Sequence, residues 1–360
     1  MKKNVLSLLL SLALLLGFAA CGETAAAVPA GASDSVAMRI FTDDCERAVE
    51  IPAEISSIVA SGPLTQIVLL AIAPEMLAGL ADEPGDVTRS YIPEELYSLP
   101  YFGQLYDSAN LNVEALAAAG PQLVIDVGEA KKSTVEDMDN LQALTQIPSV
   151  HIEATPETMP QAFRRLGSLL GKEEKAEELA LFCEEVYSRT VDIMAKVGDN
   201  KVRALYVLGE NGLNVMAKGS YHAGIFDLLT DNLAVVENPT VKGLGNAVTM
   251  EQIALWNPDF VLFAPDSIFA TAAEEPAWKE INAIRNRNYL EVPATPYNWM
   301  GTPPSVQRYL GLIWLTAELY PAYCDYDVEA EIMEYYELFY GCELTAEQYA
   351  VLTANAFGEK

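Results

Sequence analysis

The chain has 360 residues, 51% hydrophobic and 20% charged, which is typical of a folded globular protein large enough for two lobes. Its 22 lysines and arginines stand against 51 aspartates and glutamates, a formal charge of −29. That charge excludes a nucleic-acid partner, because phosphate backbones are bound by clustered cations. Only His151 and His222 supply imidazole, too little for a multi-histidine metal site.

The first residues have the order of a secretory signal. A basic start, 1–4, precedes an apolar run over 5–20 that is shorter than the ~20 residues needed to span a bilayer. Ala19, Ala20 and Cys21 resemble a bacterial lipobox, which implies that Cys21 is lipidated. Plain secretion is the alternative, since Phe18 departs from the usual leucine. We expect a signal peptide over 1–20, then the lipidated Cys21 and a flexible tether over 21–37.

The segment that would be exported is more acidic than the whole chain. Removing 1–20 takes away Lys2 and Lys3 and no acid, which leaves a formal charge of −31. We expect the protein to be held by its lipid on the outer face of the cytoplasmic membrane, with the anchor as its membrane contact. Among the remaining cysteines Cys324 and Cys342 are the favoured disulfide pair, and free thiols are the equal alternative.

From Met38 onward, short apolar runs alternate with helical patterns, which indicates an α/β fold. The predicted buried strands are 56–60, 122–127, 202–208 and 259–264. The segment 112–125 aligns without a gap with 249–262, and in each copy an N-cap side chain, Asn112 or Thr249, opens a helix. Pro121 and Pro258 then end the helix before a strand. In both copies a helix and a second strand follow, over 133–152 and 277–292, so we expect two lobes of related topology.

A different segment separates the two copies. Residues 172–197 contain no proline or glycine and keep a helical apolar period, which predicts a helix of roughly 39 Å joining the lobes. An ordinary surface helix is the alternative. The expected organisation is an N-terminal lobe over 38–155, connecting helices over 156–198, a C-terminal lobe over 199–320 and a helical extension over 321–360. The aromatic extension is expected to pack onto the second lobe.

Four segments carry a resemblance to a known family. They are 39–52, 58–65, 112–125 and 278–292, and their order over 38–320 is similar to that of the substrate-binding lipoproteins of bacterial ABC importers for iron-siderophore complexes, heme or cobalamin. The resemblance implies two Rossmann-like lobes with small parallel sheets, joined by one long backbone helix, with the ligand in a cleft between them. It also implies separate permease and ATPase chains as partners, a metal chelate as cargo and no built-in cofactor. We expect a monomer.

Ligands of open α/β sheets lie beyond the carboxyl ends of the strands, so the loops that leave each strand are the candidate site. The candidate ligand-binding residues are Thr65, Gln104, Tyr106, Glu129, Lys131, Ser220, Tyr221, His222, Leu244, Tyr297, Asn298, Trp299 and Met300. By the resemblance, Trp299 offers its aromatic face to a large ligand; packing beneath its own loop is the alternative. His222 is either a ligand contact or a residue that caps the next helix, and His151, on an apolar strand, is expected to be structural.

The charges of these loops bear on the cargo. They carry Lys131, Lys218 and Lys242 but no arginine, which favours a neutral or cationic chelate over an anionic catecholate. Candidate permease-docking acids are Glu75, Glu95 and Asp231. No nucleophile elbow, phosphate-binding glycine loop or distinctive acid pair is present, so an exported enzyme is disfavoured. An adhesion or signalling lipoprotein that reuses the fold is the other alternative.

Overall fold

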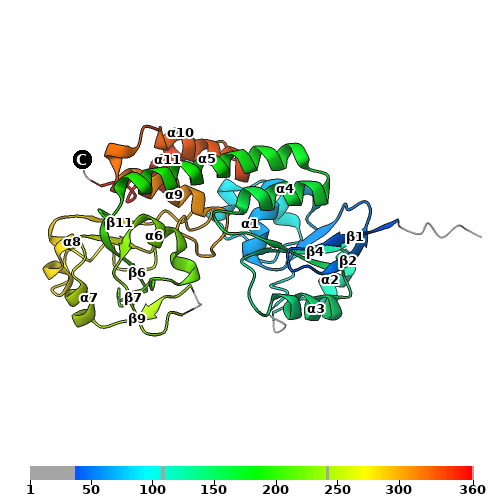
Figure 1. Ribbon diagram of the computed structural model, residues 1–360, viewed down its shortest axis with the longest axis horizontal. Helices are drawn as coiled ribbons and strands as arrows, with labels where there is room; N and C mark the ends of the chain where they lie inside the picture. Colours follow the sequence, from blue (N-terminus) through cyan, green and yellow to red (C-terminus); the bar gives the residue numbers. More distant parts are fainter. Residues whose placement is uncertain (1–36, 107–109, 241–242, 359–360) are drawn as a thin grey trace, which may run out of the picture. The chain divides into compact units, whose positions relative to one another are not determined.

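The structure is a computed structural model that describes residues 37–106, 110–240 and 243–358. The predicted signal peptide and Cys21 lie outside the described residues. Within the described ranges no helix is both long enough and apolar enough to cross a membrane. The chain from Ala37 onward forms one compact unit, and it contains two α/β lobes, as the sequence predicts (Figure 1).

The first lobe is built on a small parallel sheet of order β3-β4-β5. Its strands are β3 (Ile58–Ala60), β4 (Leu123–Gly128) and β5 (Ser149–Glu153), and its helices are α1 (Pro63–Ile72), α2 (Val113–Ala119) and α3 (Thr134–Thr145). Strands β1 (Met38–Thr42) and β2 (Ala48–Pro52) pair as an antiparallel hairpin. Short 3-10 helices, η1 (Pro74–Met76), η2 (Thr88–Tyr91) and η3 (Glu94–Ser98), fill the long connection from α1 to α2.

The second lobe repeats the parallel arrangement and adds antiparallel strands at one edge. Strands β11 (Tyr289–Glu291), β10 (Phe260–Phe263), β6 (Arg203–Leu208) and β8 (Asp231–Asn232) pair in parallel, and β7 (Asn214–Val215) and β9 (Asn246–Ala247) extend the sheet antiparallel. The helices are η4 (Tyr221–Ala223), α6 (Gly224–Leu229), α7 (Met250–Trp256), η5 (Trp278–Glu280) and α8 (Asn282–Arg285). The helix predicted after 277 is broken into η5 and α8, because Ile281 is extended.

The internal repeat has the same local chemistry in both lobes. The Asn112 side chain accepts a hydrogen bond from the Ala115 N–H at the start of α2, and Thr249 accepts one from the Gln252 N–H at the start of α7. Each helix ends in a left-handed residue, Gly120 or Asn257, and each is followed by a buried strand, β4 or β10. Capping therefore fixes both copies, as the sequence predicts.

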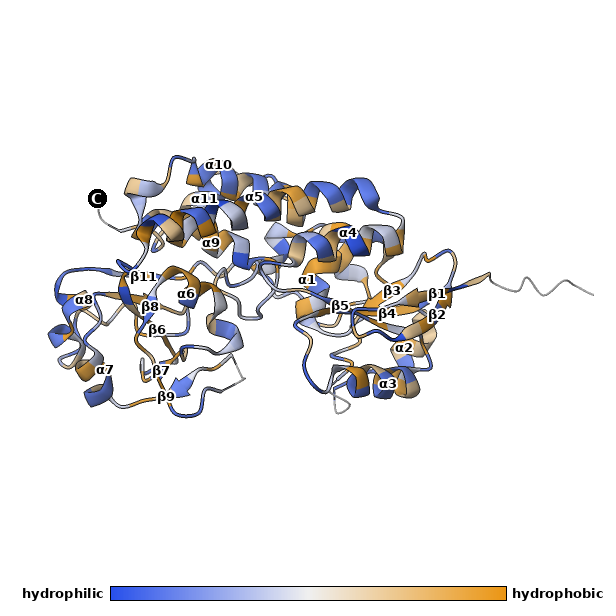
Figure 2. Ribbon diagram, viewed as in Figure 1, coloured by the Kyte–Doolittle hydropathy of each residue, from blue (hydrophilic) through white to orange (hydrophobic). Residues whose placement is uncertain are grey.

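The predicted joining helix is present as α5 (Glu173–Val197), a length of about 38 Å. It follows α4 (Met159–Leu170) across the left-handed Gly171 and contacts α1 of the first lobe and α9 (Arg308–Leu319) beside the second. Gly167 permits the close α4–α5 packing, since a Cβ there would lie 2.4 Å from the Ala176 Cβ. In Figure 2, α5 alternates between hydrophilic and hydrophobic along its length. The helix is therefore an amphipathic connector with one face in the core.

The C-terminal extension comprises η6 (Pro321–Tyr323), α10 (Val328–Tyr340) and α11 (Ala346–Leu352). It packs on more than the second lobe, contrary to expectation, because α10 contacts both α9 and α1. Phe339 lies 6.0 Å from Phe163 of α4 and 5.5 Å from Phe182 of α5, and Arg189 of α5 pairs with Glu331 of α10. One continuous core therefore runs through α1, α4, α5, α9 and α10, while smaller clusters cover the other face of each sheet.

The favoured disulfide is absent, since Cys324 and Cys342 are both free thiols. Helix α10 explains this, because its 13 residues lie between the two cysteines and separate its ends by about 20 Å. A disulfide requires Cα atoms within about 7 Å of one another. The intervening sequence forms a helix rather than a turn, and so the pairing is wrong for this structure.

Candidate functional site

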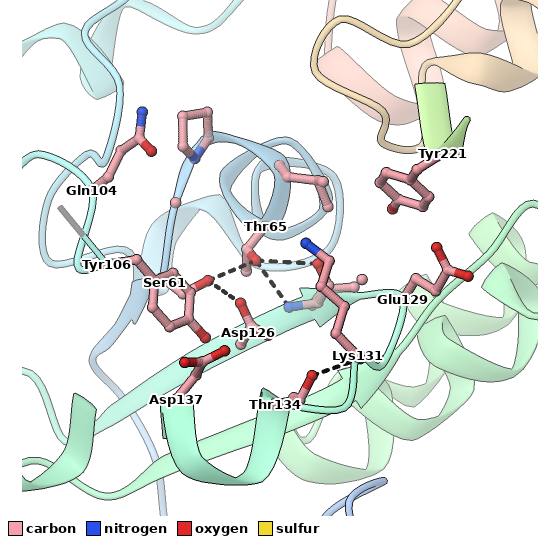
Figure 3. Close-up of a pocket in the computed structure, with 15 residues that line it drawn as sticks. Ser61, Thr65, Gln104, Tyr106, Asp126, Glu129, Lys131, Thr134, Asp137 and Tyr221 are labelled. Atoms are coloured by element: carbon pink, nitrogen blue, oxygen red, sulfur yellow. Dashed lines mark hydrogen bonds between the residues drawn. The ribbon is translucent and has the colours of Figure 1, made fainter. Parts of the chain in front are cut away.

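A pocket of about 530 Å³ opens where the strands β3 and β4 of the first lobe end. Figure 3 shows its polar side chains converging from these strand ends, from α3 and, across the opening, from Tyr221 of the second lobe. The lining residues are Ser61, Gly62, Pro63, Leu64, Thr65, Gln104, Tyr106, Asp126, Val127, Gly128, Glu129, Lys131, Thr134, Asp137 and Tyr221. The location agrees with the rule that parallel sheets bind ligands at the carboxyl ends of their strands.

The N-terminus of α1 forms part of the pocket. Gly62 is the N-cap without a side-chain hydrogen bond, Pro63 has no N–H to satisfy, and no acid stands in the first turn. Leu64 and Thr65 line the pocket directly. The first turn therefore faces the pocket with the positive end of the helix dipole.

A buried polar network supports the base of the pocket. Ser61 Oγ donates to Asp126 Oδ1 at 2.5 Å, and His151 Nδ1 lies 2.7 Å from Oδ2 of the same carboxylate. The imidazole is 1% exposed, so His151 is structural, as predicted. The three residues do not form a nucleophilic triad, because Ser61 bonds to the carboxylate instead of the imidazole. The network holds Asp126 in one orientation at the pocket wall.

Thr65 serves the fold at the edge of the pocket. Its Oγ1 accepts a hydrogen bond from the Val127 N–H at 2.9 Å and lies 3.1 Å from Ser61 Oγ. The predicted ligand residue thus lines the pocket while its hydroxyl is committed to β4.

The rim carries the side chains most available to a ligand. Gln104, Tyr106, Glu129 and Lys131 are exposed, and the Lys131 N–H donates to Thr134 Oγ1 at 2.7 Å, which fixes the turn into α3. Tyr106 is 49% exposed as a residue. Desolvation of its phenol, followed by the charge of the adjacent Asp126, raises the pKa of Tyr106. The phenol is therefore neutral and can donate or accept a hydrogen bond.

The second lobe reaches the pocket through Tyr221 in η4. Burial raises the pKa of Tyr221, while the nearby Arg308 guanidinium and a hydrogen bond from the Glu129 backbone act in the opposite direction. Arg308 opens α9, is 3% exposed, and its guanidinium carbon lies 5.5 Å from the Tyr221 ring centroid. A buried positive charge therefore lies behind the one residue that the second lobe contributes to the lining.

The structure brings six of the thirteen predicted ligand residues to the pocket. They are Thr65, Gln104, Tyr106, Glu129, Lys131 and Tyr221. The other seven do not line it: Ser220, His222, Leu244, Tyr297, Asn298, Trp299 and Met300. Five of the six that line it come from the first lobe.

Four of the seven have alternative positions that explain their absence. Ser220 is buried beneath its turn, and a His222 ring nitrogen lies 3.2 Å from the Gly301 carbonyl oxygen. Leu244 is 71% exposed on the loop before β9. The Tyr297 ring lies 6.0 Å from Tyr340 of the extension, and burial raises the pKa of Tyr297 to about 12.

The prediction that Trp299 offers its face to the ligand is wrong. Its side chain is 0% exposed and its ring lies 5.9 Å from Trp314 of α9. Gly311 allows this close approach, because a Cβ there would lie 2.5 Å from the Trp299 carbonyl oxygen. Asn298 and Met300 are buried with it, and the Asn298 side-chain oxygen accepts from the Met300 N–H. The loop packs onto α9 and stabilises the lobe.

Sequence reasoning missed Asp126, Asp137 and Arg308. Asp126 had a signal, since it is the one acid in the apolar run 122–127. Asp137 lies on a predicted helix, and Arg308 lies beyond the last of the loops that are expected to face the cleft. The predicted cleft cation Lys218 pairs with Asp231 at 3.1 Å, and Lys242 lies outside the described residues. The lining of the pocket contains Lys131 and no arginine, and Arg308 lies behind Tyr221. The preference for a neutral or cationic cargo therefore stays a prediction.

The candidate docking acids lie away from the pocket lining. Glu75 pairs with Lys172 of the α4–α5 junction at 2.5 Å, and Asp231 pairs with Lys218. Glu95 is exposed in η3. Their docking role stays a prediction. In the described part of the chain no cluster of three or more histidine, cysteine or acidic side chains is arranged to hold a metal ion.

Comparison with known proteins gives one family and several similar folds. The family model for periplasmic binding proteins matches residues 75–296. An ABC transporter solute-binding protein from Sulfurospirillum deleyianum is 26% identical with a TM-score of 0.79, over 88% of this chain and 99% of that one. A periplasmic solute-binding protein from Veillonella parvula is 22% identical with a TM-score of 0.72, over 89% and 98% of the two chains.

A third solved structure has a named cargo. The molybdate-binding periplasmic protein MolA of Haemophilus influenzae, solved with molybdate bound, is 20% identical with a TM-score of 0.66, over 85% of this chain and 99% of that one. No curated protein matches the chain.

Proposed function

We propose a cargo, a pocket and a location for this chain, which belongs to the periplasmic binding protein family. Proteins of this family bind a small molecule for an ABC transporter and do not catalyse a reaction. For this chain we propose that the cargo is a metal chelate, an iron-siderophore, heme or cobalamin, handed to separate permease and ATPase chains. The polar pocket at the ends of β3 and β4, faced by Tyr221, is the observation that carries this proposal.

The chemistry of the pocket supports a polar, oxygen-rich cargo. Hydroxyls of Thr134, Tyr106 and Tyr221, the Gln104 amide and the Lys131 ammonium offer hydrogen-bond donors, while Asp126 and its neighbouring acids accept. A volume of about 530 Å³ is within the usual range for a drug-sized ligand. Such a set can surround a compact chelate and bind the oxygen and nitrogen atoms at its surface.

The direct test is a binding titration with the chain from residue 21, carrying Cys21→Ser so that no lipid is attached. Tryptophan fluorescence quenching is measured against heme, cobalamin and a panel of ferric siderophores. We expect a dissociation constant of about 1 μM or tighter for one member, equivalent to about −8 kcal/mol. Lys131→Ala should weaken that binding, and Lys132→Ala is the matched control, because Lys132 is exposed but does not line the pocket. Binding of no member would contradict the proposal.

We also propose that the protein is exported and held at the outer face of the cytoplasmic membrane by a lipid on Cys21. The basic start, the apolar run and the small residues before Cys21 support this. Metabolic labelling with a radioactive fatty acid should label the wild type and should not label Cys21→Ser. The unlabelled variant should be released into the medium. Equal labelling of both, or retention of the variant inside the cell, would contradict this location.

A further inference from the structure

Arg308 is a buried positive charge that has no counter-ion among the residues that the structure describes. The residue is 3% exposed, and its Nε donates to the Ser305 carbonyl oxygen at 3.2 Å. Across the described ranges, no carboxylate lies within 4.0 Å of its guanidinium nitrogens. The buried Arg189 shows the usual alternative, since it pairs directly with Glu331.

Burying such a charge is costly. Removing a cation from water costs several kcal/mol, and buried charges are ordinarily paired for that reason. Burial lowers the pKa of Arg308, opposed by Tyr221, Tyr309 and Glu129, and an arginine keeps its proton at neutral pH. The Ser305 carbonyl and the Tyr221 ring lie against the guanidinium in place of a carboxylate, and neither is charged. The contacts of the fold therefore do not neutralise this buried cation.

The surrounding chain makes room for this side chain. Gly301 has φ +104°, and a Cβ there would lie 2.9 Å from Arg308 Cδ. Any other residue at 301 would therefore meet both backbone strain and the arginine. The turn after the Trp299 loop accommodates Arg308 closely, so the arginine has a fixed position behind the pocket.

Tyr221 separates Arg308 from the pocket. It lines the pocket, and its phenol is influenced by the Arg308 guanidinium on one side and by the Glu129 backbone of the first lobe on the other. Figure 3 shows the ring facing Glu129 across the opening. The neutral phenol oxygen of Tyr221 thus occupies a position between the Arg308 guanidinium and the Glu129 backbone N–H. An anionic oxygen of a ligand at that position would contact both of these donors. Only two side-chain torsions need to change for the ring to turn aside.

We propose that Arg308 is a concealed anchor for an anionic oxygen group of the cargo, which reaches it when Tyr221 turns aside. The inference rests on the proposed function, and it narrows the proposed cargo to chelates that carry an anionic oxygen group. The facing wall carries Asp126, Glu129 and Asp137. The cargo is therefore bipolar, with a carboxylate or similar anionic oxygen toward the second lobe and hydrogen-bond donors or cationic groups toward the first.

The test uses a matched pair of ligands on the full exported chain. The probes are a ferric tris-hydroxamate bearing one free carboxylate and the same chelate with that group as a primary amide. The wild type should bind the carboxylate form roughly tenfold more tightly or better, the value expected for one charge-assisted hydrogen bond. Arg308→Met should abolish that preference, Arg308→Lys should retain part of it, and Tyr221→Phe should retain most of it.

A second readout excludes a merely structural role. Without ligand, Arg308→Met should melt at or above the wild-type temperature, because an apolar side chain replaces an uncompensated charge. A melting temperature well below that of the wild type would assign Arg308 to the fold and overturn the inference. An unchanged preference for the carboxylate in Arg308→Met would overturn it as well. If the wild type binds neither probe nor any chelate of the wider panel, the proposed function itself fails.

Discussion

The two walls of the pocket reach the ligand space in different ways. The first lobe presents polar side chains from the short connections that leave β3 and β4, where Glu129 and Lys131 are exposed. The long connection from α1 to α2 adds Gln104 and Tyr106. The second lobe contributes Tyr221, while its aromatic loop, 297–300, turns back onto α9 and buries Trp299. The aromatic loop follows β11, which is a parallel strand like β3 and β4, so its different position comes from the connection and not from the strand.

This difference shows how loop length affects the use of a strand-end rule. A connection of a few residues between a strand and a helix must project beyond the sheet edge, as the connection from Gly128 of β4 to Thr134 of α3 does. A long connection such as 292–307 can pack its own apolar residues into the core instead. Trp299 does so because Gly311 of α9 leaves space for it. The first wall therefore presents several side chains to a ligand, and the second presents Tyr221 while its aromatic loop packs into the core.

The largest expected effect is on the second wall. Trp299→Ala should lower the free energy of unfolding by about 3–5 kcal/mol, because it empties a fully buried site beside Trp314. Urea denaturation followed by circular dichroism measures this loss. Trp299→Phe is the control and should lose clearly less. A stable Trp299→Ala with weakened chelate binding would place the residue in the site after all.

A smaller loss is expected at the turn that holds Arg308. Gly301→Ala should destabilise the protein by about 1–3 kcal/mol, since φ is +104° and the new Cβ would approach Arg308 Cδ to 2.9 Å. Gly62→Ala, at an extended position with no heavy atom within 4 Å of the added Cβ, is the matched control. Thermal unfolding measures the melting temperatures of the two variants, and that of Gly301→Ala should be the lower. Equal melting temperatures would show that the turn at Gly301 is no more constrained than Gly62 on the first wall.

On the first wall, Thr65→Val should cost about 1–3 kcal/mol, because the buried Val127 N–H loses its acceptor. Thr65→Ser keeps an oxygen at that position and should recover most of the loss. Chemical denaturation of both variants measures this. Equal stability of Thr65→Val and the wild type would show that the hydroxyl is free to bind ligand, as the sequence first suggested.

The smallest effect on stability is expected at the rim. Gln104→Ala and Lys131→Ala should change the free energy of unfolding by less than about 0.5 kcal/mol, because both side chains are exposed. Each should still weaken chelate binding by about two- to tenfold through a lost hydrogen bond. Calorimetric titration measures the affinity. A large fall in melting temperature without a change in affinity would reverse the assignment.

The sequence predicts most of the fold because its signals are local. Each of these signals depends on residues that are close together in the sequence. They are the helix caps Asn112 and Thr249, the apolar runs of the buried strands and the uninterrupted apolar period of α5. The same holds for the part of the first wall that lies on the short connections after β3 and β4. Trp299, Arg308 and the Cys324–Cys342 pair depend on contacts with distant segments: the space at Gly311, the position of Tyr221 and the length of α10. No local pattern encodes those contacts.

The most direct test of the proposed cargo site is a crystal structure with a bound ferric chelate, located by the anomalous scattering of its iron. The proposal predicts one iron position inside the pocket, bordered by the N-terminus of α1, Lys131 and Gln104 of the first lobe and Tyr221 of the second. It also predicts an anionic oxygen of the chelate at Arg308. An iron position outside the pocket, for a chelate that binds tightly in solution, would contradict it.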